Sequence, residues 1–328
     1  METVSCTLCG SDAFSTALTG IDRDWGSGEA FTVVKCSRCG LAYVNPRPDK
    51  EEMLKYYPAE NWSRARNRVP ERDAVISNAP WTVAAAERAD AIIRLGTKGR
   101  LLDVGCGDGF LLLYLARQGW DCYGVEPGEV AAAYAREVLG LKVSTGTFEK
   151  ADYPAAFFKV VNFQHVFEHV SDPEGTLRKA WRLLDKDGRL VISVPNFGSF
   201  DRWLFGNKWV GLKLPQHLFQ YTRRTLGAFL EKAGFEVCEV SYRSYEAADT
   251  MYYSESFRHW LQDLGLYPRK KELAAERTQV AQARAEPGPF WKRAAHFAER
   301  AVFKSVGFVA DRLGCGSTMT MVARKNER

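Results

Sequence analysis

The sequence predicts an α/β fold in which helices cover a mostly parallel sheet, with a small cysteine-rich module in front of it. From residue 81 onward, helix-like and strand-like segments alternate, which is typical of parallel strands joined by crossover helices. Near the N-terminus, four of the eight cysteines form two close pairs. The chain has 328 residues, enough for one large α/β domain and small additions.

The elements can be assigned in order along the chain. The segment 81–95 is alanine-rich and amphipathic, which predicts a helix, and 100–104 is a short apolar run that ends in a glycine loop, which predicts a strand. Further helices are expected over 110–118, 128–139, 173–184 and 224–233. Further strands are expected over 121–125, 141–144, 159–163, 189–194, 235–242 and 317–323, with a turn at 185–188.

These elements divide the chain into five parts. Residues 1–50 form the cysteine-rich module, which ends in Asn45-Pro46-Arg47-Pro48, and residues 51–80 form a polar linker. The α/β core covers 81–245 and is completed by a final strand within 314–328. Between these two, residues 246–313 form a mostly helical insertion that Pro287 and Pro289 interrupt. We expect this insertion to serve as a substrate lid, a homodimer surface or a membrane-facing patch.

The bulk composition, with 46% hydrophobic and 26% charged residues, is that of an ordinary globular protein. The longest apolar stretches, 110–115 and 190–194, are far shorter than the ~20 residues of a membrane span. The first nine residues show no basic start followed by an apolar run, so no signal peptide is indicated. We therefore expect a cytoplasmic protein without stable membrane insertion.

The formal net charge of +5 is mild and says little about partners. Much of the basic excess lies late in the chain. It is either a solvated helix face or a surface for an anionic substrate, nucleic acid or lipid headgroup. The residues concerned are Arg269, Lys270, Lys271, Lys292, Arg293, Arg300 and Lys304.

A glycine loop follows the first strand of the core. The sequence Leu-Leu-Asp-Val-Gly-Cys-Gly-Asp-Gly, residues 101–109, leads into an expected helix, whose free N–H groups point to the same place as the glycine backbone. Glu126 ends the next strand, where a carboxylate can accept hydrogen bonds from both ribose hydroxyls. The glycine spacing is tighter than in dinucleotide sites, and Asp103 adds an acid. A ligand with a cationic methionine end explains both, and a plain tight turn is the alternative.

The sequence from Asp103 to Gly109, with Glu126 behind it, closely resembles the class I S-adenosylmethionine-dependent methyltransferases. His165-Val-Phe-Glu-His-Val170, Asp172-Pro173, 187–190 and 194–196 extend the resemblance, which covers roughly residues 81–245 and the final strand. It implies a Rossmann-like, doubly wound, mostly parallel seven-stranded sheet with a reversed C-terminal edge strand. One departure is visible: many relatives have an aspartate before the fourth strand, where this chain has Phe158-Lys159.

The resemblance also assigns an S-adenosylmethionine site. Glu126 would hold the ribose and Asp103 the methionine end, Thr147 and Phe148 would lie near the adenine, and Gln164 and His165 would line the methyl-donor pocket. The complete set of expected cofactor-binding residues is Asp103, Gly105, Cys106, Gly107, Glu126, Pro127, Thr147, Phe148, Gln164 and His165.

The cysteine pairs predict a metal site. Cys6-Thr-Leu-Cys9-Gly and Cys36-Ser-Arg-Cys39-Gly have the two-residue spacing that lets both thiolates of a pair face one ion. Four thiolates make a closed tetrahedral Zn²⁺ site, which is structural because no position remains for water. Redox pairs, an iron–sulfur cluster and surface disulfides are the alternatives. A module this small needs the metal to fold.

Five histidines are candidates for the base that a hydroxyl acceptor needs. His217, in Leu214-Pro-Gln-His-Leu-Phe-Gln-Tyr221, is the preferred base, with Tyr221 as its hydrogen-bonding neighbour. His169 either takes part in the chemistry or orients the local turn. His259 and His296 are expected in the core or on the surface. Trp203, Phe205 and Trp209 form either an acceptor wall or an aromatic cluster that packs the insertion.

The leading hypothesis is methylation of a small-molecule acceptor on oxygen, in a secondary metabolite, sugar or glycan precursor, with carbon methylation of a nucleotide-linked sugar in the same class. The second hypothesis is an RNA-modifying methyltransferase whose zinc module and basic insertion hold RNA. Nucleobase amino methylation is disfavoured, because Asn162-Phe-Gln-His165 lacks the Asn/Asp-Pro-Pro-aromatic motif of such enzymes. The third hypothesis, a non-enzymatic zinc-containing interaction protein, does not explain Glu126 and the intact glycine loop.

Overall fold

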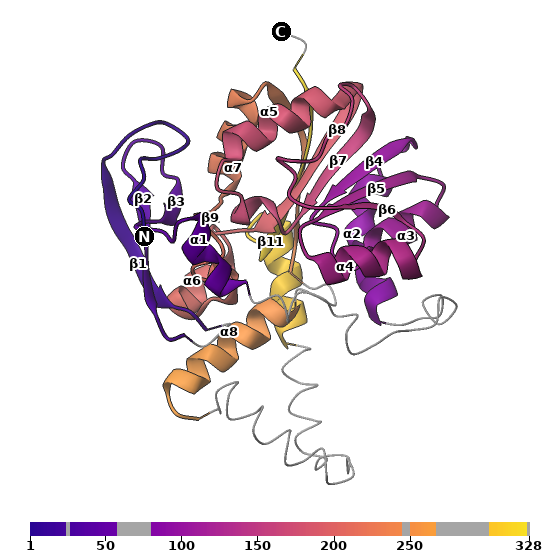
Figure 1. Cartoon of the computed structure of the whole chain (residues 1–328). Coiled ribbons are helices and arrows are strands. Elements are labelled where there is room, and N and C mark those ends of the chain that lie inside the picture. Colours follow the sequence, from indigo (N-terminus) through magenta and orange to yellow (C-terminus); the bar gives the residue numbers. More distant parts are fainter. Residues whose placement is uncertain (24–26, 58–79, 245–249, 267–301, 327–328) are drawn as a thin grey trace, which may run out of the picture.

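The computed structural model describes residues 1–23, 27–57, 80–244, 250–266 and 302–326. These form a seven-stranded sheet with helices on both faces and a smaller four-stranded sheet beside it (Figure 1). The large sheet has the order β10-β11-β8-β7-β4-β5-β6. Its strands are β4 (Arg100–Val104), β5 (Asp121–Glu126), β6 (Lys142–Thr145), β7 (Phe158–Gln164), β8 (Leu184–Pro195), β10 (Phe235–Arg243) and β11 (Thr318–Lys325).

Alternation along the central strands builds a core on each face of this sheet. Leu101 and Val160 pack with α2 (Pro80–Ile93), α3 (Phe110–Arg117) and α4 (Glu129–Ala133). Their neighbours Leu102 and Val161 face the other core, which contains α5 (Pro173–Leu183) and α7 (Arg223–Lys232). The predicted doubly wound α/β fold is therefore confirmed, because both faces of a mostly parallel sheet are covered.

The predicted reversal of the last strand is also confirmed. β11 runs antiparallel to β10, where Phe235 pairs with Lys325, and to β8, where Thr318 pairs with Pro195. Its place is one position in from the edge of the sheet, because β10 flanks it on the outer side.

Two local predictions differ from the structure. The expected turn at 185–188 lies inside β8, since Leu184 already pairs with Phe158 and the register shifts before Arg189 pairs with Val160. The expected helix over 128–139 changes after Ala133 into a π-helical turn over Tyr134–Val138. Such π-turns are frequent at functional sites.

The smaller sheet was not predicted. It has the order β1-β2-β3-β9, with β1 (Phe14–Ile21), β2 (Ala30–Cys36), β3 (Ala42–Val44) and β9 (Phe219–Gln220). Three strands come from the cysteine-rich module, whereas β9 comes from the core region. The short helix α1 (Lys50–Met53) follows, and Asp49 caps it by accepting from the backbone N–H groups of Glu51 and Glu52.

The region between β10 and β11 contains α8 (Thr250–Asp263) and a helix over 302–312. Another helix that was not predicted, α6 (Phe200–Phe205), follows β8. None of the described helices is long and apolar enough to cross a membrane. Several features singled out in the sequence lie outside the described residues: Pro287, Pro289, His296, Arg269, Lys270, Lys271, Lys292, Arg293 and Arg300.

Candidate active site and zinc site

The glycine loop joins β4 to α3 and is held in left-handed backbone conformations. Gly105, Gly107 and Gly109 have φ values of 68°, 55° and 82°. A Cβ on Gly105 would lie 2.6 Å from Cγ2 of Val166, and one on Gly109 would lie 2.7 Å from Cδ1 of Leu141. A Cβ on Gly107 would meet no atom within 4 Å. Two glycines therefore serve close packing, whereas Gly107 borders open space that a ligand can occupy.

Glu126 ends β5 and binds the same loop. Its Oε2 accepts from the Gly107 N–H at 2.8 Å, and its Oε1 accepts from the Gly128 N–H at 2.7 Å. Burial raises the pKa of Glu126, and these two backbone hydrogen bonds oppose the rise. Each carboxylate oxygen keeps a further lone pair, so the group can still accept from ribose hydroxyls.

Asp103 lies in β4 and is almost completely buried. Its Oδ1 accepts from Nδ2 of Asn162 on β7 at 2.7 Å. Burial raises the pKa of Asp103 to about 7, although the Asn162 hydrogen bond and Arg88 both favour the charged form. A carboxyl group with this pKa is half protonated near neutrality, so an adjacent ammonium group would shift it to the carboxylate.

The other expected cofactor residues occupy three kinds of position. Gln164 ends β7 and His165 follows it, and both are half-buried at the carboxyl edge of the sheet, where β4 and β5 also end. Phe148 is buried, edge-on to Phe163 at 5.4 Å. Thr147 and Pro127 are exposed. Cys106 is partly buried, and burial raises the pKa of its thiol, so it is an inert packing residue.

Next to the expected donor pocket lies a cluster of one carboxylate, Glu168, and three histidines, His165, His169 and His217. Glu168, 1% exposed, has its Oε1 at 3.7 Å from Nδ1 of His165 and at 3.8 Å from Nε2 of His217. Among the described residues, neither carboxylate oxygen of Glu168 has a hydrogen-bond partner. Burial alone would raise the pKa of Glu168, but His165, His217 and His169 together lower it to about 2. Glu168 is therefore a buried, ionised acceptor with unused lone pairs.

Backbone carbonyls orient the two histidines beside Glu168. His217 is buried, and its Nδ1–H donates to the Gly211 carbonyl at 2.7 Å, which leaves the lone pair on Nε2 facing Glu168. Nδ1 of His169 lies 3.0 Å from the Gln216 carbonyl and 2.8 Å from the Tyr57 hydroxyl. The two rings meet edge-on at 4.6 Å. Burial lowers the pKa of both histidines, that of His217 to about 3, so both rings are neutral near pH 7.

The structure does not contain the predicted hydrogen bond between Tyr221 and His217. Tyr221 is fully buried and stacks on Phe167 at 5.4 Å and on Phe219 at 5.8 Å. Its hydroxyl has no hydrogen-bond partner among the described residues. Its aromatic packing fixes the ring away from such a bond. Burial, with the nearby Glu168 charge, holds the pKa of Tyr221 well above its usual value.

The aromatic residues before His217 do not form one wall. Trp209 is buried and donates its Nε1–H to Oδ2 of Asp201 at 2.7 Å, whereas Trp203 is 71% exposed. His259 is buried in α8, with Nδ1 at 3.0 Å from the Lys208 carbonyl, which agrees with its expected place in the core.

Two residues beside the buried histidines were not predicted as site residues: Glu168 and Tyr57. Glu168 lies in the motif from His165 to Val170, so its position was visible, but its burial among three histidines was not. Tyr57 lies in a segment interpreted as a linker. The ligand atoms of Glu168, His169 and His217 lie within 4.8 Å of one another, so this set could also hold a metal ion.

The four N-terminal cysteines converge. Sγ of Cys6 lies 3.4 Å from that of Cys39, and Sγ of Cys9 lies 3.6 Å from that of Cys36, with all four within 4.8 Å of one another and none in a disulfide. Tetrahedral zinc with Zn–S bonds of about 2.3 Å places sulfurs about 3.8 Å apart. After each pair, the N–H of Gly10 or Gly40 donates to the carbonyl of the first cysteine, at 2.7 and 3.0 Å. The geometry therefore fits a closed zinc site.

Comparisons with known proteins identify the α/β core that carries the glycine loop. A family model described as a methyltransferase domain matches residues 80–240. The ubiquinone biosynthesis O-methyltransferase of Azorhizobium caulinodans is 34% identical over 154 residues, which cover 43% of this chain and 60% of that protein. The protein of the same name from Aromatoleum aromaticum is 30% identical over 166 residues, which cover 47% of this chain and 70% of that protein.

The match therefore spans less than two thirds of the first of these relatives. Among solved structures, a putative sarcosine dimethylglycine methyltransferase from Galdieria sulphuraria is 15% identical with a TM-score of 0.48, over 74% of this chain and 86% of that chain. From the sequence matches to the family model and the curated relatives, the chain belongs to the S-adenosylmethionine-dependent methyltransferase family.

Proposed function

We propose that the protein transfers a methyl group from S-adenosylmethionine to an oxygen atom of a small-molecule acceptor: a secondary metabolite, a sugar or a glycan precursor. The observation that carries this proposal is the buried Glu168 carboxylate, unpartnered among the described residues and facing the free Nε2 of His217. The similarity to curated relatives named as O-methyltransferases of ubiquinone biosynthesis supports oxygen as the acceptor atom. Carbon methylation of a nucleotide-linked sugar stays the alternative within this class.

The proposed donor and acceptor sites adjoin each other. Val166, whose Cγ2 would touch a Cβ on Gly105, lies between His165 and Glu168 in the chain. The glycine loop and the histidine cluster thus meet at the carboxyl edge of the sheet. Methyl transfer needs this proximity, because it is an in-line displacement whose main requirement is alignment of the acceptor with the donor carbon.

When bound, S-adenosylmethionine supplies an electrophilic methyl group. Nε2 of His217 would take the proton of the acceptor hydroxyl as the oxygen bonds to the methyl carbon and the bond from that carbon to the donor sulfur breaks, which leaves S-adenosylhomocysteine. Protonation places an imidazolium 3.8 Å from the Glu168 carboxylate. Glu168 offsets part of what burial costs this charge, although the pKa of His217 stays at about 3, so the pair, rather than the histidine alone, acts as the base. The Gly211 carbonyl keeps Nε2, and not Nδ1, free for this step.

The test is methylation of a panel of hydroxyl compounds by the zinc-loaded protein, with Glu168→Gln as the inactive reference. The proposal is supported if the wild-type protein methylates an oxygen atom and Glu168→Gln does not. Transfer only to carbon or nitrogen would contradict it. Turnover that requires added Mg²⁺ or Mn²⁺ would instead assign Glu168, His169 and His217 to a metal. Of the basic residues behind the RNA hypothesis, only Lys304 is described.

We also propose that Asp103 binds the ammonium group of the donor, which predicts a pH dependence. In the free protein, the raised pKa of Asp103, about 7, keeps the carboxyl protonated below neutrality. The ammonium group favours the carboxylate, so binding below pH 7 must release a proton. Affinity for S-adenosylhomocysteine should therefore rise from about pH 5.5 to about pH 7, by up to tenfold per unit, and then level off. Calorimetry measures both affinity and proton release.

Asp103→Asn is the matched control for this pH dependence. It keeps the size of the side chain and removes the titrating group. Its affinity should be weaker and nearly independent of pH over the same range. An equal slope in the wild type and in this variant would assign the dependence to another group, such as Glu126, whose pKa burial also raises.

The four-thiolate site should hold about one zinc ion per chain. Cys36→Ser should lower the zinc content and destabilise the N-terminal module, because the metal supplies the folding free energy that this small module lacks. Cys238→Ser is the control, since Cys238 is exposed on β10. Zinc content by elemental analysis and thermal unfolding are the measurements. Full zinc retention in Cys36→Ser would refute the four-cysteine assignment.

A further inference from the structure

The cysteine-rich module shares a sheet with the segment that carries His217. β3 pairs with β9, with Ala42 opposite Gln220 and Tyr43 opposite Phe219. The N–H of Val44 donates to the carbonyl of Leu218 at 2.9 Å. Because Leu218 follows His217 directly, the module is hydrogen-bonded to the backbone next to the proposed base.

The zinc site lies at the turn of the hairpin formed by β2 and β3. Cys36 is the last residue of β2, Cys39 lies in the turn, and β3 begins at Ala42. Cys6, Cys36 and Tyr43 belong to one buried cluster with Phe219 and Tyr221. A change in the β2–β3 turn therefore acts on the strand that contacts β9.

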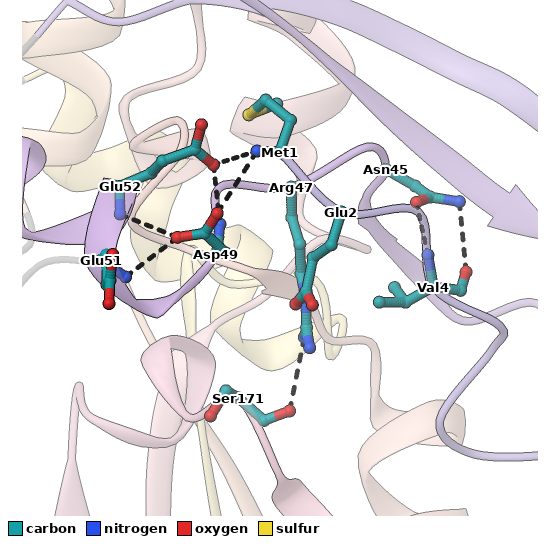
Figure 2. Close-up of polar contacts among 9 residues, drawn as sticks. All are labelled: Met1, Glu2, Val4, Asn45, Arg47, Asp49, Glu51, Glu52 and Ser171. Carbon is teal, nitrogen blue, oxygen red and sulfur yellow. Dashed lines mark hydrogen bonds and ion pairs between the residues drawn. The ribbon is translucent and has the colours of Figure 1, made fainter.

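The segment that carries His217 and the segment that carries His169 are both contacted by Arg47, Tyr56 or Tyr57. Nε2 of Gln216 donates to the carbonyl of Tyr56, and the Tyr57 hydroxyl lies 2.8 Å from Nδ1 of His169. Figure 2 shows Arg47 next to Glu2 and directed towards Ser171, which follows His169 by two residues. The distance from Nη1 of Arg47 to the Ser171 carbonyl is 3.4 Å. Residues 1–57 thus contact both segments that carry the buried histidines.

The donor side is held by different contacts. Glu126 takes its hydrogen bonds from Gly107 and Gly128, and Asp103 takes one from Asn162. The parallel pairing of β4 with β5 and β7 positions these residues. All of these hydrogen bonds lie within the core, so the donor side depends on the module only through apolar contacts in the buried cluster that they share.

We propose that residues 1–57, folded by zinc on the four cysteines, act as a positioning clamp for the acceptor half of the site. Occupancy of the zinc site sets the order of the segment 214–222, which carries His217, and leaves the S-adenosylmethionine half unchanged. The catalytic consequence rests on the proposed function of His217. The structural coupling itself does not, and amide exchange measures it without any acceptor.

The experiment is hydrogen exchange on the full-length protein with zinc bound, after removal by a chelator, and after zinc is returned. Without zinc, amides in peptides over 31–46 and 214–222 should exchange roughly tenfold faster or more. Peptides over 100–126 should change by less than about twofold, and so should the affinity for S-adenosylhomocysteine. Returning zinc should restore the protection.

Two results would overturn the clamp. Unchanged exchange over 214–222 after zinc loss would show that the module and the acceptor half are uncoupled. Equal acceleration over 100–126 would show that zinc supports the whole fold instead of one half. Neither result depends on turnover, so they remain distinct from a failure to find methyl transfer.

Val44→Pro tests the same coupling while the cysteines stay intact. Proline removes the N–H that Val44 donates to Leu218. This variant should keep about one zinc per chain and lose protection over 214–222 by a similar factor. A zinc-loaded Val44→Pro with wild-type exchange over 214–222 would refute the role of β3–β9 pairing. Cys39→Ser, with Cys238→Ser as control, repeats the zinc-loss arm without a chelator.

Discussion

Replacement of His217 by asparagine should lower turnover by about 10²–10⁴-fold, the usual contribution of a positioned general base. Asparagine keeps a side-chain N–H that can donate to the Gly211 carbonyl but has no basic nitrogen to face Glu168. Affinity for S-adenosylhomocysteine should stay within about twofold, because the donor side is held by contacts in the core. Turnover near the wild-type value would reject His217 as the base.

Glu168→Gln should lower turnover by a factor comparable to that of His217→Asn. The double variant should turn over only slightly more slowly than the slower single variant. Residues that act as one unit show such non-additivity, because removal of either partner disables both. Kinetics on the two single variants and the double variant form the cycle. Strictly additive losses would show that Glu168 and His217 act independently.

His259→Asn is the matched control for this cycle. Like His217, His259 is buried with its Nδ1 on a backbone carbonyl, that of Lys208. Loss of a buried imidazole as such should therefore affect His259→Asn and His217→Asn alike. We expect near-normal turnover in His259→Asn, which assigns the loss in His217→Asn to chemistry.

Glu126→Ala should weaken binding of S-adenosylhomocysteine by about 10²- to 10⁴-fold. The change removes the acceptor for the proposed ribose hydroxyls and also releases the N–H groups of Gly107 and Gly128. Charge-assisted hydrogen bonds of this kind contribute about 1.5–3 kcal/mol each. Calorimetric titration gives the affinity.

Asp121→Ala is the control for the Glu126 variant, because Asp121 lies exposed at the opposite end of β5 and pairs with Lys142. Its affinity should be unchanged. Unchanged affinity in Glu126→Ala as well would remove the ribose assignment, and equal weakening in both variants would point to damage of the strand rather than loss of a contact.

The parts of the fold that depend on local pattern could be predicted from the sequence. The strand over Arg100–Val104 has its predicted bounds, because a short apolar run favours a strand and the glycine that follows ends it. Asp103, the glycine loop and Glu126 form a connected site for the same reason, since parallel strands end at a common edge.

The parts that depend on distant partners could not be predicted. β9 has two residues, Phe219 and Gln220, and becomes a strand only because β3 lies beside it. Likewise, the sequence around Glu168 does not indicate that the folded chain places His217 beside its carboxylate. Local sequence pattern does not predict which distant residues come together in the fold, because each of them lies in a different segment of the chain.

We propose that the glycine loop and Glu126 form the donor site of a zinc-containing methyltransferase. The most direct test is calorimetric titration of the purified protein with S-adenosylhomocysteine, with zinc content measured on the same sample. We expect affinity on the order of micromolar and about one zinc per chain. No binding by a folded, zinc-loaded sample would contradict the donor-site assignment.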